Sequence, residues 1–266
     1  MTRIRVLFCA LLVPAHLAAF AKLTPEAISA FDRYVKLTEV RMKGDLHPER
    51  FLPVAVTPEI KGRLRAGELR IERAPATKDQ GKEIKVPGGL IHHWLGAMFI
   101  PNTTIASVHA VMHDYEHYST FYQAKVTESK QIAHQGDEDD IFLRVYMKQF
   151  LTVVLNSQYH VRYAMLDPQH AYVISRSTRI AEVKDLKHPD AGEEPVGNDS
   201  GFLWRLNWYW RLEQADGGVY AEWELISLSR DVPLAFRWML KGFVEKMPKE
   251  FVMTTLRGTK AAVEKR

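Results

Sequence analysis

Apolar and polar residues alternate with a period of two over most of the chain beyond residue 68, a pattern typical of half-buried β-strands. Turn residues such as Asp167-Pro168 and Asp216-Gly217 separate the alternating segments. The predicted strands cover residues 69–71, 84–86, 90–100, 126–133, 141–150, 157–166, 171–183, 202–213 and 219–229. Because turns join most of the longer segments, we expect an antiparallel sheet, which should also curve.

Apolar residues at helical spacing mark the remaining elements. Thr24-Pro25-Glu26 is a typical helix start, with a capping residue, a proline in the first turn and an acidic side chain near the positive end. The predicted helices cover residues 24–42, 105–115, 118–122 and 233–264, with a candidate kink at Pro248. Segments rich in proline and glycine at 45–67 and 184–201 predict surface connections.

The order of these elements predicts an α+β fold. A helix and short strands come first, followed by a long strand, two helices, a run of antiparallel strands and a long C-terminal helix. A long apolar-faced helix is the natural cover for the concave face of a curved sheet. We therefore expect a curved antiparallel sheet wrapped around the C-terminal helix, with an N-terminal helical and strand extension.

The last two strands carry the clearest register signal. If Asp216-Gly217 is a two-residue type I′ turn, Ala215 lies opposite Gly218 and the other pairs follow. One face of this hairpin is then aromatic and dry, with Leu206, Trp208, Trp210, Ala221, Trp223 and Leu225. The other face is polar, with Arg205, Asn207, Tyr209, Arg211, Glu222 and Glu224. We interpret the polar face as the solvated one, with Arg211 and Glu222 paired across the strands.

Neighbouring strands offer matching apolar faces. These faces carry Leu143, Val145, Met147, Tyr159, Val161, Tyr163 and Met165. Large aromatic side chains and methionines on one concave sheet suit an adaptable apolar pocket. The alternative is an ordinary core that the C-terminal helix fills completely.

The first 21 residues have the pattern of a secretory signal peptide. Arg3 and Arg5 form a basic start, an apolar run follows, and Ala19-Phe20-Ala21 provides small residues at a cleavage site. The alternative is an uncleaved membrane anchor, but Pro14 and His16 interrupt the apolar run, which is short for a membrane span. We predict cleavage after Ala21 and a periplasmic or secreted mature protein without stable membrane insertion.

Composition excludes several classes of protein. The chain has 36 basic and 32 acidic residues, and loss of Arg3 and Arg5 would leave 34 against 32, a charge of +2 that does not indicate nucleic-acid binding. The single cysteine, Cys9, would leave with the signal peptide. A mature chain without cysteine has no disulfides, no thiol catalysis and no cysteine-ligated metal.

Candidate catalytic and metal motifs are weak. His109, His113 and His117 recur every four residues, and three histidines along a straight helix span roughly 12 Å, too far for one ion. The histidine spacing and the missing cysteine ligands therefore predict no metal site. No nucleophile elbow or phosphate-binding loop occurs either, and we predict no cofactor. The acidic run 137–140 is interpreted as a solvated hairpin tip, with weak calcium binding as the alternative.

Arg176 has two interpretations. Strand alternation places it on one face with Tyr172, Ile174 and Ile180. If that face lines the cavity, Arg176 would pair with a carboxylate or phosphate group of a ligand. If the face is wet, Arg176 is a solubilising charge.

The layout resembles the START/SRPBCC superfamily, whose helix-grip fold is shared by birch-pollen-allergen-like proteins, lipid-transfer domains and polyketide cyclases. The resemblance covers about residues 90–263, including Trp94-Leu95-Gly96 and 126–129, which look like the first two strands of that superfamily. Segments 177–183, 201–207 and 224–231 look like uncharacterised exported bacterial proteins. The resemblance implies an extension over 22–89 and a START/SRPBCC-like domain over 90–266, and it transfers fold better than function.

We predict non-catalytic binding or transport of a hydrophobic small molecule, such as a lipid, fatty acid or polycyclic compound, in an internal cavity. The candidate ligand-binding residues are Trp208, Trp210, Trp223, Leu225, Leu206, Met147, Tyr159, Tyr163 and Arg176. One alternative is a cyclase- or hydrolase-type enzyme that uses Tyr163, Tyr159 and Arg176 in the same cavity. The other is a structural or interaction protein with a filled core.

Overall fold

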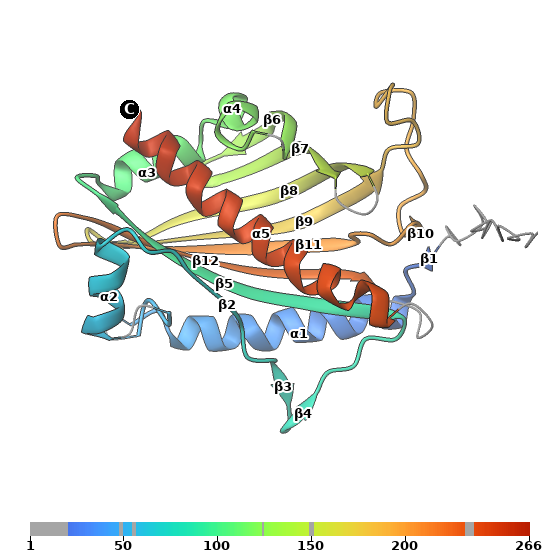
Figure 1. The fold of residues 1–266 in the computed structure, drawn as a ribbon, viewed down its shortest axis with the longest axis horizontal. Helices are drawn as coiled ribbons and strands as arrows, with labels where there is room; N and C mark the ends of the chain where they lie inside the picture. Colours follow the sequence, from blue (N-terminus) through green and yellow to red (C-terminus); the bar gives the residue numbers. More distant parts are fainter. Residues whose placement is uncertain (1–20, 48–49, 55–56, 124, 149–151, 232–236) are drawn as a thin grey trace, which may run out of the picture.

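An eight-stranded antiparallel sheet forms the centre of the protein (Figure 1). The computed structural model describes residues 21–47, 50–54, 57–123, 125–148, 152–231 and 237–266, so the signal-peptide prediction lies almost wholly outside the described residues. The strand order is β2-β5-β12-β11-β9-β8-β7-β6. From β6 to β9, and again from β11 to β12, strands adjacent in sequence are adjacent in the sheet, as the alternating pattern predicted.

The element bounds agree with most sequence predictions. The sheet strands are β2 (Arg70–Arg73), β5 (Gly89–Pro101), β6 (Val126–Gln135), β7 (Glu138–Lys148), β8 (Thr152–Asp167), β9 (His170–Glu182), β11 (Arg205–Ala215) and β12 (Gly218–Arg230). Two small pairs, β1 (Ala21–Lys22) with β10 (Asn198–Asp199) and β3 (Lys78–Asp79) with β4 (Lys82–Glu83), lie outside it. No strand forms at 84–86 among the described residues. The short hairpin of β3 and β4 lies just before this segment and ends at Glu83.

The register of the last hairpin is confirmed. Asp216 and Gly217 have φ angles of 53° and 76°, the left-handed conformation that a type I′ turn requires at both central residues. Trp210 consequently pairs with Trp223 across the two strands. Two residues therefore set the position of every side chain on the hairpin.

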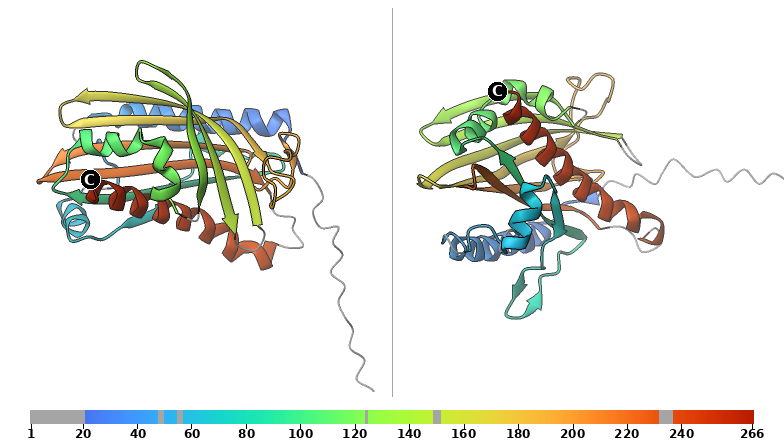
Figure 2. Two further views of the ribbon diagram at one scale, coloured as in Figure 1. Left: turned by 90° about the horizontal axis from the view of Figure 1, so that it is seen from above. Right: turned by 60° about the vertical axis from the view of Figure 1, so that its left-hand side comes forward.

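Helices cover both faces of the sheet (Figure 2). The long helix α5 (Arg237–Glu264) crosses the concave face, and at Gly96 of β5 an added Cβ would lie 2.5 Å from a methyl group of Val252. Helix α3 (Ile105–Met112), the 3₁₀ turn η2 (Tyr115–His117) and α4 (Tyr118–Phe121) lie on the same side, and Val108, Val111 and Met112 share the core with α5. This arrangement confirms the predicted helix-grip fold.

The N-terminal helix α1 (Pro25–Gly44) covers the convex face, which the sequence did not indicate. Its start is as predicted, since the Thr24 hydroxyl accepts a hydrogen bond from the Ala27 amide at 3.2 Å. Phe31, Tyr34 and Met42 of α1 pack against residues of β9, β11 and β12. The interpretation of the polar hairpin face as solvated is therefore wrong: Arg211, Glu222 and Glu224 on that face are fully buried.

A further helix, α2 (Pro58–Arg65), lies within the stretch predicted to be an irregular connection. Its start repeats the pattern of α1, because Thr57 precedes Pro58 and Glu59 and its hydroxyl accepts a hydrogen bond from the Ile60 amide. Strand β2 pairs with β5, so the N-terminal extension contributes an edge strand to the sheet and helices to its periphery. The described helices include none that is both long enough and apolar enough to span a membrane.

Candidate functional site

An apolar pocket lies between the concave face of the sheet and the first half of α5. The sheet lines it with Val126, Leu143, Val145, Met147, Leu155, Ser157, Tyr159, Leu206, Trp208, Leu225 and Ser227. The segment before β11 adds Phe202 and Leu203, and α5 adds Met247, Pro248 and Phe251. The cavity volume is about 70 Å³. This is room for about two water molecules at their liquid volume of roughly 30 Å³ each.

Strand pairing builds the aromatic wall of the pocket. Trp208 of β11 lies opposite Leu225 of β12, and the register is fixed by the Asp216-Gly217 turn. The Trp208 ring packs against the Tyr159 ring of β8 with a centroid distance of 4.3 Å. Trp208 remains only partly buried, in contrast to its neighbours Leu206 and Leu225. Its indole is therefore the large lining side chain that a bound molecule can contact with least rearrangement of the sheet.

The opposite wall depends on α5 and on the segment before β11. Pro248 lies inside α5 and has no N–H group, so the helix lacks a backbone hydrogen bond at that position. Met247 and Phe251 lie on either side of it and point toward the sheet. The Phe251 and Trp223 rings pack together with their centroids 5.7 Å apart. This wall is therefore attached by side-chain packing and by a helix that is weakened at Pro248.

The polar groups of the pocket are neutral: three hydroxyls and the indole N–H of Trp208. The Ser157 hydroxyl donates a hydrogen bond to the carbonyl of Leu143 at 2.9 Å. Burial raises the pKa of Tyr159 well above its ordinary value, so the phenol stays protonated. Ser227 provides the third hydroxyl, and no lining side chain among the described residues carries a charge.

Five of the nine residues predicted as ligand contacts line this pocket. They are Leu206, Trp208, Leu225, Met147 and Tyr159. The remaining four, Trp210, Trp223, Tyr163 and Arg176, lie elsewhere in the protein. The pattern of the sequence identified the correct face of the sheet but not the part of that face that stays open.

Trp210 and Trp223 lie further along the concave face, where α5 packs closely. Their rings stack on each other with centroids 5.7 Å apart, and both side chains are buried. Val252 and Leu256 of α5 complete this packing, with no exposed surface at either residue. In this structure the two tryptophans are core residues rather than parts of the pocket wall.

Tyr163 belongs to a buried polar cluster at the other end of the concave face. Its hydroxyl lies 2.6 Å from that of Tyr115, which donates a hydrogen bond to Asp139. Asp139 also accepts from Gln131 and lies 2.7 Å from a ring nitrogen of His134. The interpretation of residues 137–140 as a solvated tip is wrong at Asp139, which is buried because η2 brings Tyr115 onto it.

Arg176 does not face the pocket. Its guanidinium group binds Glu39 of α1 on the convex side, with Nε 2.9 Å from the carboxylate. The predicted face also breaks within the strand, because β8 and β9 shift register between Arg179 and Ser177. As a result Ile180 packs in the concave core, whereas Arg176 lies on the other face.

The histidines in and after α3, His109, His113 and His117, do not converge on one site. His117 pairs with Asp114 at 2.6 Å, and His113 stacks on Tyr163 at a centroid distance of 3.8 Å. Burial lowers the pKa of His109 to about 4, which keeps its ring neutral. In the part of the chain that the structure describes, no group of three or more metal-ligating side chains has suitable geometry.

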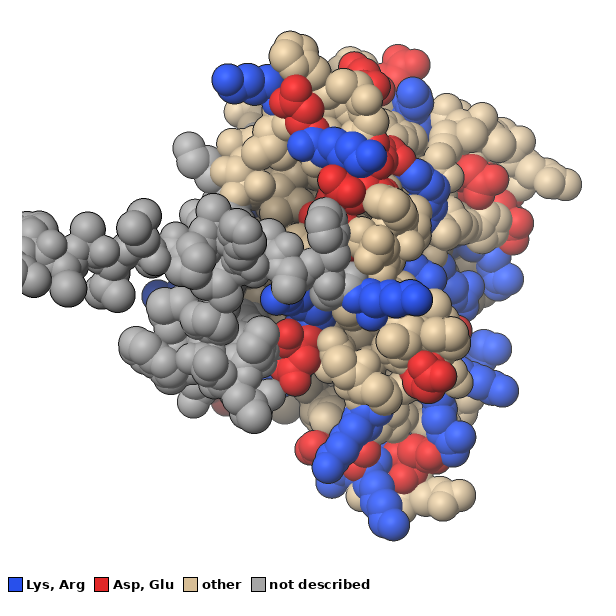
Figure 3. Space-filling view, turned by 90° about the vertical axis from the view of Figure 1, so that its right-hand side faces the viewer, with Lys and Arg blue, Asp and Glu red and all other residues tan. Residues whose placement is uncertain are grey.

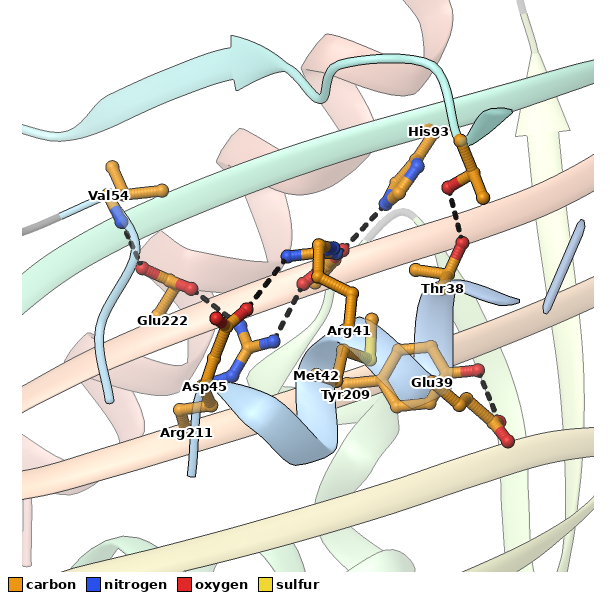
Figure 4. A network of polar contacts seen from close by, with 12 residues as sticks. Thr38, Glu39, Arg41, Met42, Asp45, Val54, His93, Tyr209, Arg211 and Glu222 are labelled. Carbon is orange, nitrogen blue, oxygen red and sulfur yellow. Dashed lines mark hydrogen bonds and ion pairs between the residues drawn. The ribbon is translucent and has the colours of Figure 1, made fainter. Parts of the chain in front are cut away.

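A second buried cluster, on the convex face, holds α1 to the hairpin (Figure 4). Arg211 donates to Glu222 at 2.6 Å and to Glu224 at 2.9 Å. Glu224 is also bound by Arg41 of α1 and lies 2.7 Å from His93. We call the five residues Arg41, His93, Arg211, Glu222 and Glu224 the convex charge cluster.

The two carboxylates of the convex charge cluster have opposite pKa shifts. Burial raises the pKa of Glu222 to about 7, although Arg211 and the Val54 amide act against this. Burial would also raise the pKa of Glu224, but the hydrogen bond from His93 and the charge of Arg211 lower it to about 2. The predicted pair of Arg211 and Glu222 is confirmed, but sequence reasoning missed its burial and its further partners, because α1 and the segment at Val54 are distant in sequence.

Sequence reasoning missed several pocket residues, among them Phe202, Leu203, Met247 and Phe251. Met247 and Phe251 lie on α5, and Phe202 and Leu203 lie in a segment predicted as the start of a strand, whereas β11 begins only at Arg205. Charges on the end of the molecule shown in Figure 3 are mixed: Lys and Arg side chains lie among Asp and Glu side chains. That face therefore has no continuous basic patch among its described residues.

Comparisons with known proteins give structural similarity alone. No family model matches the sequence, and no curated protein matches it. The structure is similar to human STARD10, with 13% identity, TM-score 0.46 and coverage of 79% of this chain and 80% of that one. A STAR-related lipid transfer protein fragment from Xanthomonas axonopodis has 15% identity and TM-score 0.45, over 73% of this chain and 98% of that one. The Zhui aromatase/cyclase from Streptomyces sp. R1128 has 13% identity and TM-score 0.43, over 66% and 96%. The helix-grip fold of this chain is defined by its own strand order and by α5 on the concave face.

Proposed function

We propose that this protein binds a hydrophobic small molecule, without chemistry, between the concave sheet and the first half of α5. The observation that carries the proposal is the pocket lining: large apolar and aromatic side chains from the sheet, α5 and the segment before β11 converge on one space. Pockets for small apolar ligands have this composition, with a few polar groups that set orientation. A lipid, a fatty acid or a polycyclic compound are the candidate ligand classes.

Binding requires the pocket to widen. Sites for drug-sized ligands have volumes of roughly 300–1,000 Å³, whereas this cavity has about 70 Å³. Pro248 offers a physical route, because the turn of α5 around it lacks a backbone hydrogen bond and can move away from the sheet at low cost. Movement of Phe202 and Leu203 would open the same side. A ligand would then replace the contacts that these residues make with Trp208 and Tyr159.

The small volume also favours one rival function, a structural or interaction protein with a filled core. The enzyme alternative gains no support, since its three candidate groups do not meet: Tyr159 lines the pocket, Tyr163 lies at the other end and Arg176 is on the opposite face. A titration distinguishes binding from a filled core.

We also propose that the protein is exported and that a signal peptidase cleaves after Ala21. The supporting observation is the order of basic, apolar and small residues in the first 21 positions. Cleavage there would leave Lys22, a residue of β1, as the first residue of the mature chain. N-terminal sequencing of the protein recovered from the periplasm should begin at Lys22, and an intact Met1 would contradict this.

The binding proposal is tested by titrating the purified protein with a fluorescent acyl probe and with a fluorescent polycyclic probe. We expect a saturable change in probe and tryptophan fluorescence, together with a higher melting temperature because a ligand that binds only the folded state stabilises it. Saturation without a change in circular dichroism would exclude binding to unfolded protein. If neither probe gives a saturable change, the binding proposal is contradicted and the filled-core alternative stands.

A further inference from the structure

We propose that the pocket selects an uncharged ligand, an apolar molecule whose polar group is a hydroxyl or a carbonyl rather than a carboxylate or a phosphate. This inference rests on the proposed binding function and specifies the ligand class that the same pocket takes. It removes ionised fatty acids from the candidate classes and keeps neutral lipids and neutral polycyclic compounds.

The first argument is the chemistry of the lining. Among the described lining residues, the polar side-chain groups are the hydroxyls of Ser157, Tyr159 and Ser227 and the indole N–H of Trp208, and none of them carries a charge. Tyr159 stays protonated because burial raises its pKa. A hydroxyl or carbonyl oxygen of a ligand can exchange hydrogen bonds with these groups. An ionised carboxylate would lose its hydration and gain no cationic partner from the described lining side chains, which is strongly unfavourable in an apolar site.

The second argument is the direction of the arginine side chains on the surrounding strands. Arg144, Arg176, Arg179 and Arg211 come from β7, β9 and β11, whose concave faces build the concave interior. Each of the four binds a carboxylate away from the pocket: Glu128 and Asp190, Glu39, Glu193, and Glu222 with Glu224, respectively. These four arginines therefore direct their charges away from the pocket.

The third argument is that the polar groups of the concave interior nearest to the pocket strands are also neutral. His92 is opposite Ser227 across β5 and β12, and burial lowers its pKa to about 4, so the ring is uncharged. The Ser175 hydroxyl lies opposite Trp208 across β9 and β11, is fully buried and has no hydrogen-bond partner. These groups can bond to a neutral oxygen that reaches deeper than the present pocket.

The test compares ligands that differ only in charge. Hexadecan-1-ol and hexadecanoate, and a polycyclic alcohol with its carboxylate derivative, are measured at pH 8 by displacement of the fluorescent probe from the full-length protein. We expect the alcohol of each pair to bind at least tenfold more tightly than the carboxylate. Equal affinity, or tighter binding of the carboxylates, would overturn the inference while leaving the binding function intact. If the probes and all four ligands fail to bind, the proposed function itself is wrong.

A variant at the pocket rim sharpens this test. Leu203 is partly exposed, so Leu203→Lys can place an ammonium group at the pocket while its stem keeps the apolar contact. We expect this variant to bind hexadecanoate at least tenfold more tightly than the control Leu203→Met, which adds no charge. Equal affinities of two folded variants for hexadecanoate would contradict selection by charge.

Discussion

The two faces of the β11–β12 hairpin are both buried, but they are buried by different kinds of contact. On the convex face, Arg211, Glu222 and Glu224 are held by directional hydrogen bonds and by a cation from α1. On the concave face, Trp208 and Leu225 meet α5 and the segment before β11 through apolar packing alone. Directional contacts fix one geometry, whereas apolar packing tolerates several arrangements of similar energy. The convex face therefore holds the register that the Asp216-Gly217 turn sets, and the concave face can change shape around a ligand.

The concave face is itself divided. Trp223 lies where Val252 and Leu256 approach the sheet closely, and Trp208 lies where Pro248 interrupts the helix. The same residue type on the same hairpin face thus has two roles, one in the core and one at the pocket. The predictions below test this division and the contrast between the two faces.

The largest effect is expected from Arg211→Ala. Removal of the guanidinium group leaves Glu222 and Glu224 buried without their shared partner, and loss of one member of a buried ion pair reduces the free energy of unfolding by about 3–5 kcal/mol. Denaturant melts measure it. Arg176→Ala is the matched control, because the partly exposed Arg176–Glu39 pair contributes about 0–1 kcal/mol. Similar losses for the two variants would show that the convex charge cluster does not fix the hairpin.

Trp223→Ala should reduce stability by a similar or slightly smaller amount, about 3–5 kcal/mol, since it opens a cavity in a packed part of the core. Probe affinity, measured under conditions where the variant is folded, should stay within about threefold of the wild type. A large loss of affinity in the folded variant would place Trp223 in the ligand wall.

The pH dependence of the convex charge cluster gives a smaller effect. The pKa of Glu222 is raised to about 7 from 4.5, so the proton-bound form is favoured in the folded state. The protonated Glu222 side chain therefore stabilises the folded state below about pH 4.5, and this contribution to the free energy of unfolding is lost as the pH rises to about 7. Glu222→Gln keeps the neutral form, so the stability difference between variant and wild type should shift in favour of the variant over this range. A difference independent of pH in denaturant melts would contradict the raised pKa.

Trp208→Ala should have the smallest effect on stability and the largest effect on binding. Its side chain is only partly buried and borders the cavity, so we expect a loss of about 1–2 kcal/mol, below the usual range for a packed tryptophan. Probe affinity should fall at least tenfold. Unchanged probe affinity would show that Trp208 does not contact the ligand. The structural contrast between Trp208 and Trp223 would then be unrelated to binding.

The parts of this fold that local chemistry determines were predictable from the sequence. Asp216-Gly217 fixed the hairpin register, and Thr24 with Pro25 marked the start of α1. Thr57 and Pro58 carry the same start signal for α2, but the helix is short and polar, and the surrounding prolines favoured an irregular segment.

Features that depend on contacts distant in sequence were not predictable. Arg211 and Glu222 alternate with apolar residues along their strands, which is the pattern of a solvent-exposed face. That face is buried because α1 packs against it. Arg176 and Ile180 have the same parity in β9, and a register shift separates their faces. The division between Trp208 and Trp223 depends on how closely α5 approaches each of them, which strand alternation does not encode.

The most direct test of the binding function is native mass spectrometry of the full-length protein expressed with its N-terminal segment and recovered from a bacterial periplasm. We predict a one-to-one complex with an uncharged apolar molecule, which organic extraction removes and which Trp208→Ala fails to retain. Trp223→Ala, when folded, should retain it. A wild-type protein that carries no small molecule and binds none of the neutral ligands offered to it would contradict the proposal and establish a filled core.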